Sequence, residues 1–259
     1  MRIKFTFDLP EGKIELPIHY NHIVQAMIYA NISDTLADFI HNEGFRFEKR
    51  TFKLFTFSRL MGKHRVRKAH QNKNKAFSST TITYDSPLSF YLSSPYEDIL
   101  QEFANRTVAG TSIRMGRHDI FIASVRVLFP PAVNESALKI KMLSPMAVRS
   151  TLYDKTGARK TYYYSPLEKE FPELISRNIL KKYYSFNGCY PEDREFVIRP
   201  FLFAENKNLR KMNYKGFVIK AYDGIYELSG SKELIGFAYD CGLGERNSQG
   251  CGMFEVWEK

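Results

Sequence analysis

Cysteine and long apolar runs are what this sequence most clearly lacks. Its 259 residues include three cysteines, Cys189, Cys241 and Cys251, and no two of them form a C-x-x-C pair. An odd number of widely spaced cysteines argues against a disulfide framework and against a zinc site. No apolar run approaches the roughly 20 residues that cross a bilayer, and the strand-like start at Met1–Phe5 is unlike a signal peptide. We therefore expect a protein of the reducing cytoplasm with no membrane partner.

The common catalytic motifs are missing as well. Histidine and the acidic residues nowhere take the spacing of zinc ligands, and no serine or cysteine sits in a nucleophile elbow. A Walker phosphate loop is excluded because no glycine-rich run ends in Gly-Lys-Ser or Gly-Lys-Thr. The dinucleotide fingerprint fails because Asn247 stands where its last glycine or alanine would be. We expect neither a metal ion nor a cofactor.

Positive charge is in excess. The chain has 38 Lys and Arg against 28 Asp and Glu, a net charge of +10. Residues 59–75 hold seven of these cations and no acid, which suits either a solvated loop or a strand that follows a phosphate backbone. The candidate contacts to a nucleic acid in this basic segment are Arg59, Lys63, Arg65, Arg67 and Lys68.

Hydrophobic periodicity gives the two halves of the chain the same rhythm. In the first half it predicts strands at 3–7, 51–58, 76–84 and 87–93, helices at 17–31, 33–42 and 96–106, and a hairpin at 111–129. In the second half it predicts strands at 137–149, 195–204, 214–228 and 253–257, and helices at 166–184 and 231–240. Each half follows βαββαβ, so we predict an α+β fold of two tandem ferredoxin-like, RRM-like domains. They are residues 1–129 and 137–259, joined by a linker at 130–136 that contains Pro130-Pro131.

A glycine-rich loop stands out near residue 250. It reads Gly242-Leu243-Gly244, five polar residues, then Gly250-Cys251-Gly252. Glycine accepts positive φ and lets another backbone or a ligand come close, and successive N–H groups in such a loop can form an anion nest. A turn between a helix and a strand is the alternative interpretation.

Three residues in the first half suit acid–base chemistry on RNA. Tyr29 and His41 lie on helix faces opposite the apolar stripes, and Lys53 interrupts an apolar strand. Each has an ordinary explanation as a surface residue. Together they suit attack of an RNA 2′-OH on the adjacent phosphate, which needs a base, an acid and a cation but no metal. Histidine titrates near neutrality, whereas tyrosine is a weak base that would need help from Lys53.

The glycine loop and several other stretches resemble one family. The stretches are Leu16–His22 leading into Ile28-Tyr29, Lys53–Ser58, Leu143–Val148, Pro166–Phe171, Ile235–Tyr239 and Met253–Val256. With them the chain resembles the CRISPR-associated endoribonucleases that cut repeat RNA into guide units, the "Cas six" family of the RAMP superfamily. The resemblance extends over nearly the whole chain.

This resemblance implies a metal-independent endoribonuclease that cleaves CRISPR repeat RNA in precursor transcripts to give guide crRNAs. Its products would carry a 2′,3′-cyclic phosphate and a 5′-hydroxyl. The family's catalytic tyrosine, histidine and lysine fall on Tyr29, His41 and Lys53. Because the stretch between His41 and Lys53 is longer here than in the relatives, the other candidate histidines stay open as alternative acids or bases; they are His22, His64 and His70.

The resemblance also implies contacts and partners. The loop's candidate RNA contacts are Gly242, Gly244, Arg246, Gly250 and Gly252. Repeat RNA in its precursor transcript is the expected partner, with subunits of a CRISPR effector complex as a further one, and both a monomer and a homodimer remain open. The rival interpretation is a non-catalytic crRNA-binding subunit of an effector complex. A general RNA-binding protein with RRM-like halves is less favoured because the sequence has no RNP1-like run.

Overall fold

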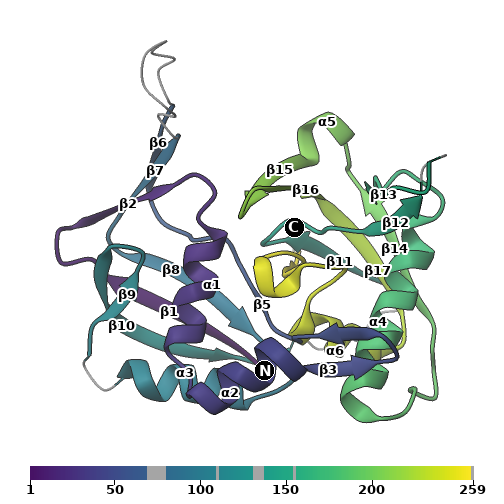
Figure 1. Ribbon diagram of the computed structural model, residues 1–259, viewed down its shortest axis with the longest axis horizontal. Helices are drawn as coiled ribbons and strands as arrows, with labels where there is room; N and C mark the ends of the chain where they lie inside the picture. The colour runs from purple at the N-terminus through teal and green to yellow at the C-terminus, as the bar shows by residue number, and fades with distance from the viewer. Residues whose placement is uncertain (69–79, 109–110, 131–136, 154–155, 258–259) are drawn as a thin grey trace.

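Two β-sheets, one from each half of the chain, stand side by side with helices packed around them (Figure 1). The computed structural model describes residues 1–68, 80–108, 111–130, 137–153 and 156–257. The first sheet has the strand order β5-β8-β1-β10-β9, and all neighbouring strands are antiparallel. Its strands and the two helices between them are β1 (Arg2–Asp8), α1 (Asn21–Ala30), β5 (Thr56–Phe57), β8 (Leu88–Ser93), α3 (Asp98–Val108), β9 (Ile113–Met115) and β10 (His118–Leu128).

The second sheet repeats this arrangement with the order β14-β17-β11-β18. Its elements are β11 (Ala137–Met142), α4 (Phe171–Asn187), β14 (Phe196–Phe201), β17 (Ile225–Gly230), α6 (Lys232–Cys241) and β18 (Phe254–Val256). In both sheets the first principal strand lies between the third and the fourth, and the second pairs with the third. This is the strand order of a ferredoxin-like βαββαβ unit, so the predicted α+β fold is confirmed.

Smaller elements decorate the two sheets. A three-stranded sheet joins β2 (Lys13–Pro17), β7 (Thr81–Asp85) and β6 (His64–Arg67). Three hairpins are β3 (Phe45–Phe47) with β4 (Arg50–Phe52), β12 (Arg149–Tyr153) with β13 (Arg159–Tyr163), and β15 (Leu209–Tyr214) with β16 (Phe217–Tyr222). The short helices are α2 (Asp34–Asp38), the π-helix η1 (Phe39–Glu43), α5 (Glu205–Asn208) and the 3₁₀ helix η2 (Asn247–Gln249).

The prediction of one strand at 51–58 is wrong, because β4 ends at Phe52 and β5 begins only at Thr56. Leu54 adopts a φ of 47° and is buried in the core of the second half, whereas Phe55 is buried in the core of the first half. A φ of 47° lies outside the extended region of a strand, so the chain turns at Leu54 instead of continuing straight. The chain therefore passes between the two cores here, and Lys53 stands at the crossing.

Other boundaries differ for similar reasons. The first helix begins at Asn21, because Leu16 and Pro17 pair with β7 as part of β2. The strand expected at 137–149 ends at Met142, and the following residues form isolated bridges that reach Tyr222 and Glu245. The strand expected at 214–228 is divided between β16 and β17. Part of the strand expected at 76–84 falls outside the described residues.

Side chains of the first half bind backbone carbonyls near the end of the second half. The guanidinium of Arg2 lies 3.5 Å from the centre of the Tyr239 ring and donates hydrogen bonds to the carbonyls of Tyr239 (2.5 Å) and Phe254 (2.6 Å). The Thr56 hydroxyl donates to the carbonyl of Cys251 at 2.9 Å, and Asn21 Nδ2 donates to that of Gln249 at 2.8 Å. The domain division at 130–136 stays a proposal, because residues 131–136 lie outside the described part of the chain.

Candidate active site

Three separate elements bring Tyr29, His41 and Lys53 together. Tyr29 comes from α1, His41 from η1, and Lys53 from the crossing between β4 and β5. Lys53 Nζ donates a hydrogen bond to Tyr29 Oη over 3.4 Å, and the Tyr29 and His41 ring centres lie 6.4 Å apart. The sequence prediction that these residues share one site is therefore compatible with the geometry.

Local capping explains where His41 stands. Ser33 is the predicted N-cap of α2, and its hydroxyl accepts a hydrogen bond from Leu36 N at 3.2 Å. The helix then loosens into the π-turn η1 and ends at Gly44, whose φ of 55° suits glycine. A Cβ at Gly44 would lie 2.7 Å from the carbonyl oxygen of Phe52, so the turn packs directly against β4, which leads into Lys53.

A short chain of hydrogen bonds orients the imidazole. Asn42 Nδ2 donates to Asp38 Oδ1 at 2.5 Å, which turns the amide oxygen of Asn42 toward His41. That oxygen lies 2.7 Å from His41 Nδ1 and accepts its hydrogen. In a neutral ring with this tautomer Nε2 carries the free lone pair, and His41 is exposed. The histidine is thus arranged to take up a proton at Nε2.

Burial acts on Tyr29 and Lys53 in opposite directions. It raises the pKa of the half-buried Tyr29 phenol well above its usual value, and the nearby Tyr214 raises it further. Burial lowers the pKa of the Lys53 ammonium. Desolvation disfavours the charged form of each group, so Tyr29 is a neutral phenol at neutral pH. It is better suited to donate a proton or hydrogen bond than to act as a base.

The glycine-rich loop forms the opposite wall of a small cleft beside Lys53. This cleft of about 180 Å³ is lined by residues 51–54 from the first half and by Arg246–Gln249 from the loop. Arg246 adopts a φ of 63°, and its guanidinium approaches the Gln249 side chain at 3.4 Å. Of the loop's candidate RNA contacts, Arg246 is the one with a half-exposed side chain beside Lys53.

The loop's four glycines are buried against the protein itself. A Cβ at Gly252 would lie 2.0 Å from the carbonyl oxygen of Leu243, and one at Gly250 would lie 2.5 Å from the Phe57 ring. Gly244 is similarly close to the carbonyl oxygen of Ala147, and Gly242 is similarly close to the side chains of Asn247 and Thr56. All four have positive φ. The close approach that glycine permits is therefore made within the chain, and a contact of these glycines with RNA stays a prediction.

Lys182 holds the loop from behind. This lysine of α4 is 2% exposed, and its Nζ donates to the carbonyls of Gly242 (2.8 Å) and Gly244 (2.7 Å) and to Asn247 Oδ1 (2.7 Å). Asn247 Nδ2 in turn donates to the carbonyls of Leu243 and Cys251, each at 3.0 Å. Sequence reasoning could not find this arrangement, because Lys182 follows Lys181 in a helix and looks like an ordinary surface residue.

The basic segment divides into two parts. Arg59 forms an ion pair with Asp223 of the second half, which also pairs with Arg210 at 2.7 Å. The other described cations are exposed on and around β6, which projects from the body in Figure 1, and Arg65 is paired with Asp85 at 3.2 Å. The remaining members of the segment, His70, Lys73 and Lys75, lie outside the described residues. The prediction that the segment follows a phosphate backbone remains untested.

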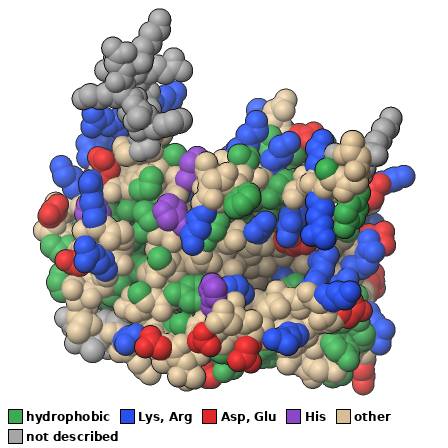
Figure 2. Space-filling view, viewed as in Figure 1, with side chains coloured by type: hydrophobic (Ala, Val, Ile, Leu, Met, Phe, Trp, Pro, Cys, Tyr) green, Lys and Arg blue, Asp and Glu red, His purple; other side chains and the backbone are tan. Residues whose placement is uncertain are grey.

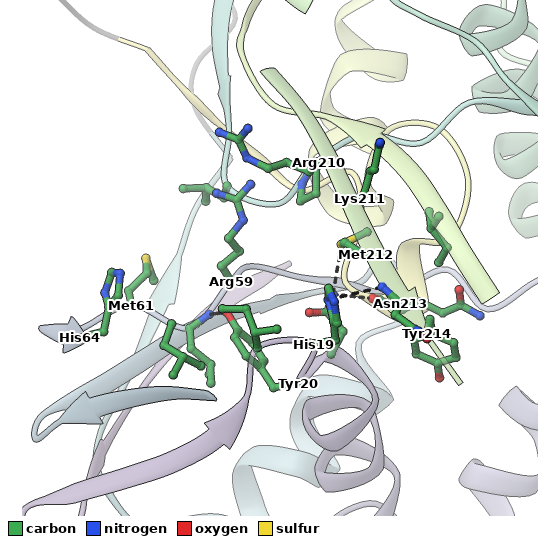
Figure 3. A pocket seen from close by; sticks show the side chains of 18 of the residues that line it. His19, Tyr20, Arg59, Met61, His64, Arg210, Lys211, Met212, Asn213 and Tyr214 are labelled. Carbon is green, nitrogen blue, oxygen red and sulfur yellow. Dashed lines mark hydrogen bonds between the residues drawn. The ribbon is translucent and has the colours of Figure 1, made fainter. Parts of the chain in front are cut away.

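A larger cavity of about 640 Å³ opens between the start of α1 and the β15–β16 hairpin. Figure 3 shows Arg59 and Arg210 reaching it from the two halves, with His19 below and His64 at one side. The alternative candidate His64 lines this cavity, and none of His22, His41 and His64 is among the residues that line the cleft of Lys53. Sequence reasoning missed Arg210 and Lys211 in this cavity, because it did not find β15.

Figure 2 shows this face of the molecule hollowed near its centre, with Lys and Arg side chains gathered above and to the right of the hollow. Within the described ranges, no group of three His, Cys, Asp or Glu is placed to hold a metal ion. In the same part of the chain, no helix has the length and apolarity needed to cross a membrane. All three cysteines are free, and burial raises the pKa of Cys241 to about 11 and that of Cys251 to about 12.

Comparisons with known proteins agree over the whole chain. Residues 15–126 match the family model "CRISPR-associated protein Cas6, N-terminal", and residues 129–256 match "CRISPR associated protein Cas6, C-terminal". A "CRISPR-associated endoribonuclease Cas6 1" of Methanocaldococcus jannaschii is 27% identical over 98% of this chain and 91% of its own length. A "CRISPR-associated endoribonuclease Cas6" of Pyrococcus furiosus is 28% identical over 96% and 87%.

The fold agrees with a solved structure described as a Cas6-related gene product of Pyrococcus furiosus. The two superpose with a TM-score of 0.79 at 22% identity, over 100% of this chain and 99% of the other. Two family models that meet near residue 128 and together extend from 15 to 256 leave one conclusion: the chain belongs to the Cas6 family of CRISPR-associated proteins.

Proposed function

We propose that this protein is a metal-independent endoribonuclease that cleaves CRISPR repeat RNA in precursor transcripts to give crRNAs. The observation that carries the proposal is the convergence of Tyr29, His41 and Lys53, from three separate elements, beside a cleft between the two halves. The two relatives named as CRISPR-associated endoribonucleases support the substrate and the reaction class.

The proposed reaction is attack of a 2′-OH on the adjacent phosphate. His41 Nε2 takes the 2′-OH proton, the 2′ oxygen bonds to phosphorus, and the bond from phosphorus to the 5′ oxygen breaks. The neutral Tyr29 phenol donates its proton to the leaving 5′ oxygen, and Lys53, which already donates to Tyr29 Oη, stabilises the negative charge. The products are a 2′,3′-cyclic phosphate and a 5′-hydroxyl.

The first test uses repeat RNA from a CRISPR array of the source genome, incubated with the protein in EDTA. We expect a discrete cut, and we expect one 2′-deoxy substitution just before the scissile phosphate to abolish it. Cleavage that requires magnesium, or cleavage of the deoxy substrate, would falsify the mechanism. Tight binding of the RNA without a cut would support the rival interpretation, a non-catalytic crRNA-binding subunit.

The second test separates the two proton transfers. In a substrate with sulfur in place of the 5′ leaving oxygen, the leaving group needs little protonation, because a thiolate leaves readily. Tyr29→Phe should cut the ordinary RNA slowly and the thio substrate at nearly the parental rate, whereas His41→Ala should cut both slowly. If the thio substrate restores His41→Ala instead, the roles of the two residues are reversed.

A further inference from the structure

A second cleft, of about 200 Å³, lies beyond the candidate active site, between α4 and the segment around Arg149 and Glu245. Asn178 of α4 lines it and is 7% exposed. Neither its amide nitrogen nor its amide oxygen has a hydrogen-bond partner among the described residues. Both amide atoms are almost fully covered, so the side chain lies in the wall of the cleft with a donor and an acceptor that no described residue uses.

Such a side chain is costly unless something binds it. A buried polar group without a partner loses its hydration and gains nothing in return, whereas an apolar residue of the same shape would cost nothing. Four residues further along the same helix face, Lys182 is also buried, but the glycine-rich loop accepts all three of its hydrogen bonds. Asn178 differs from Lys182 because it lines a cleft and its amide makes no hydrogen bond with the described residues.

Cations surround Asn178. Arg50, Arg149, Arg177 and Lys181 line the same cleft. Glu245, the acid that lines it, is shared by Arg149 at 2.7 Å and Arg50 at 3.4 Å. Arg177 approaches Glu173 at 3.5 Å, but both side chains are more than half exposed, so that pair is weak. The cleft is thus suited to a negatively charged ligand.

The cleft is continuous with the candidate active site. A third cleft, of about 390 Å³, shares Arg50, Arg149 and Glu245 with it and shares Thr51, Phe52 and Arg246 with the cleft of Lys53. A single strand that passes Lys53 and continues along Arg246 therefore reaches Asn178 without leaving this basic surface. The three clefts together are lined by five Arg or Lys residues apart from Lys53 and Lys182: Arg50, Arg149, Arg177, Lys181 and Arg246.

We propose that Asn178 reads one unpaired nucleotide of the bound RNA. When RNA binds, the covered amide turns into the cleft and donates to and accepts from the edge of the base, as an asparagine does when it binds an adenine edge. Lys181 and Arg177 bind the flanking phosphates. The proposal rests on the proposed RNA substrate and adds a subsite outside the chemical step. It gives the protein a specificity determinant on the second half, away from Tyr29, His41 and Lys53.

The first experiment compares Asn178→Leu with the parent by titration with repeat RNA and by thermal unfolding. Leucine fills the space but has no polar group, so the melting temperature should stay the same or rise while RNA affinity falls about 10- to 100-fold. The single-turnover cleavage rate at saturating RNA should change little. The matched control is Asn187→Leu, an exposed asparagine of the same helix that does not line the cleft, and it should bind RNA like the parent.

The second experiment locates the base. RNAs that each lack one base are titrated against the parent and against Asn178→Leu. At one position, loss of the base should weaken RNA binding to the parent but should not weaken RNA binding to Asn178→Leu any further. If leucine prevents folding, Asn178→Ala takes its place in the same cycle.

Two outcomes would overturn the subsite. One is a lower melting temperature with unchanged RNA affinity, which makes Asn178 structural. The other is a base scan that shows equal losses in parent and variant at every position. A parent protein that binds no repeat RNA would instead overturn the proposed function on which the subsite depends.

Discussion

The glycine-rich loop and the Tyr29–His41–Lys53 site lie against each other but are held in opposite ways. The loop's carbonyls accept hydrogen bonds of 2.7 to 3.0 Å from Lys182, Asn247 and Thr56, and its glycines are buried. The candidate catalytic side chains share one 3.4 Å hydrogen bond, and His41 is exposed. From this difference we infer that the loop is a structural element whose polar groups bind within the protein, whereas the site keeps polar groups free for a ligand.

The sharpest test of the claim that the glycine-rich loop is structural is Gly252→Ala. Its Cβ would meet the carbonyl oxygen of Leu243 at 2.0 Å with φ at 85°, so we expect a loss of about 2–5 kcal/mol in the free energy of unfolding. Chemical denaturation measures this loss. Gly216→Ala is the matched control, because Gly216 has a φ of 87° but nothing within 4 Å, and it should lose only the smaller cost of backbone strain. Equal losses would show that the loop's packing contributes nothing.

Lys53→Ala tests the claim that the Tyr29–His41–Lys53 site performs the chemistry. Removing a cation placed to stabilise the transition state should slow single-turnover cleavage by about 10²-fold or more, with little change in stability. Because burial lowers the pKa of Lys53, parental activity should fall on the alkaline side at a lower pH than an exposed lysine would give. Lys53→Arg keeps its charge to higher pH and should move that fall upward. Identical alkaline limits in the parent and Lys53→Arg would remove Lys53 from the proposed chemistry.

The smallest expected effect separates the exposed cations on and around β6 from Arg59, whose ion pair with Asp223 is more buried than the pair of Arg65 with Asp85. Each RNA phosphate neutralised contributes about 0.7 to the slope of log affinity against log salt for a single strand, so replacing Arg65, Arg67 and Lys68 with alanine should flatten the slope by up to about 2. Arg59→Ala should flatten it less, because that side chain is already paired with Asp223. An unchanged slope in the triple variant would mean that β6 is a solvated strand.

The sequence predicted the fold well because local patterns specify ferredoxin-like units. Alternation in the strands and the Ser33 and Ser231 caps marked most elements, and both serines do cap their helices. What it could not show was the register in which the halves meet. Leu54 is a residue of the first half that packs in the core of the second half. A leucine would suit either core, so its local sequence does not show which one it enters.

The candidate site was predictable to a different degree. Tyr29, His41 and Lys53 bear recognisable chemistry, so residue type and resemblance sufficed to nominate them. Asn178 and Lys182 could not be found this way, because their significance depends on burial and on partners far along the chain. The glycine spacing was visible in the sequence, but spacing alone does not tell whether the close neighbour is a ligand or the protein's own carbonyl oxygen.

The hydrogen bonds between the halves also set the order in which the proposed active site can be assembled. Asn21 and Thr56 bind carbonyls of residues made 228 and 195 positions later, and Arg2 waits for a carbonyl 252 positions away. During synthesis Tyr29, His41 and Lys53 leave the ribosome early, but the wall of their cleft, Arg246–Gln249, comes almost last among the described residues. A nascent chain that has not yet reached Arg246 therefore carries the chemical groups without this wall of the cleft, and on the proposed function it would not yet cut RNA.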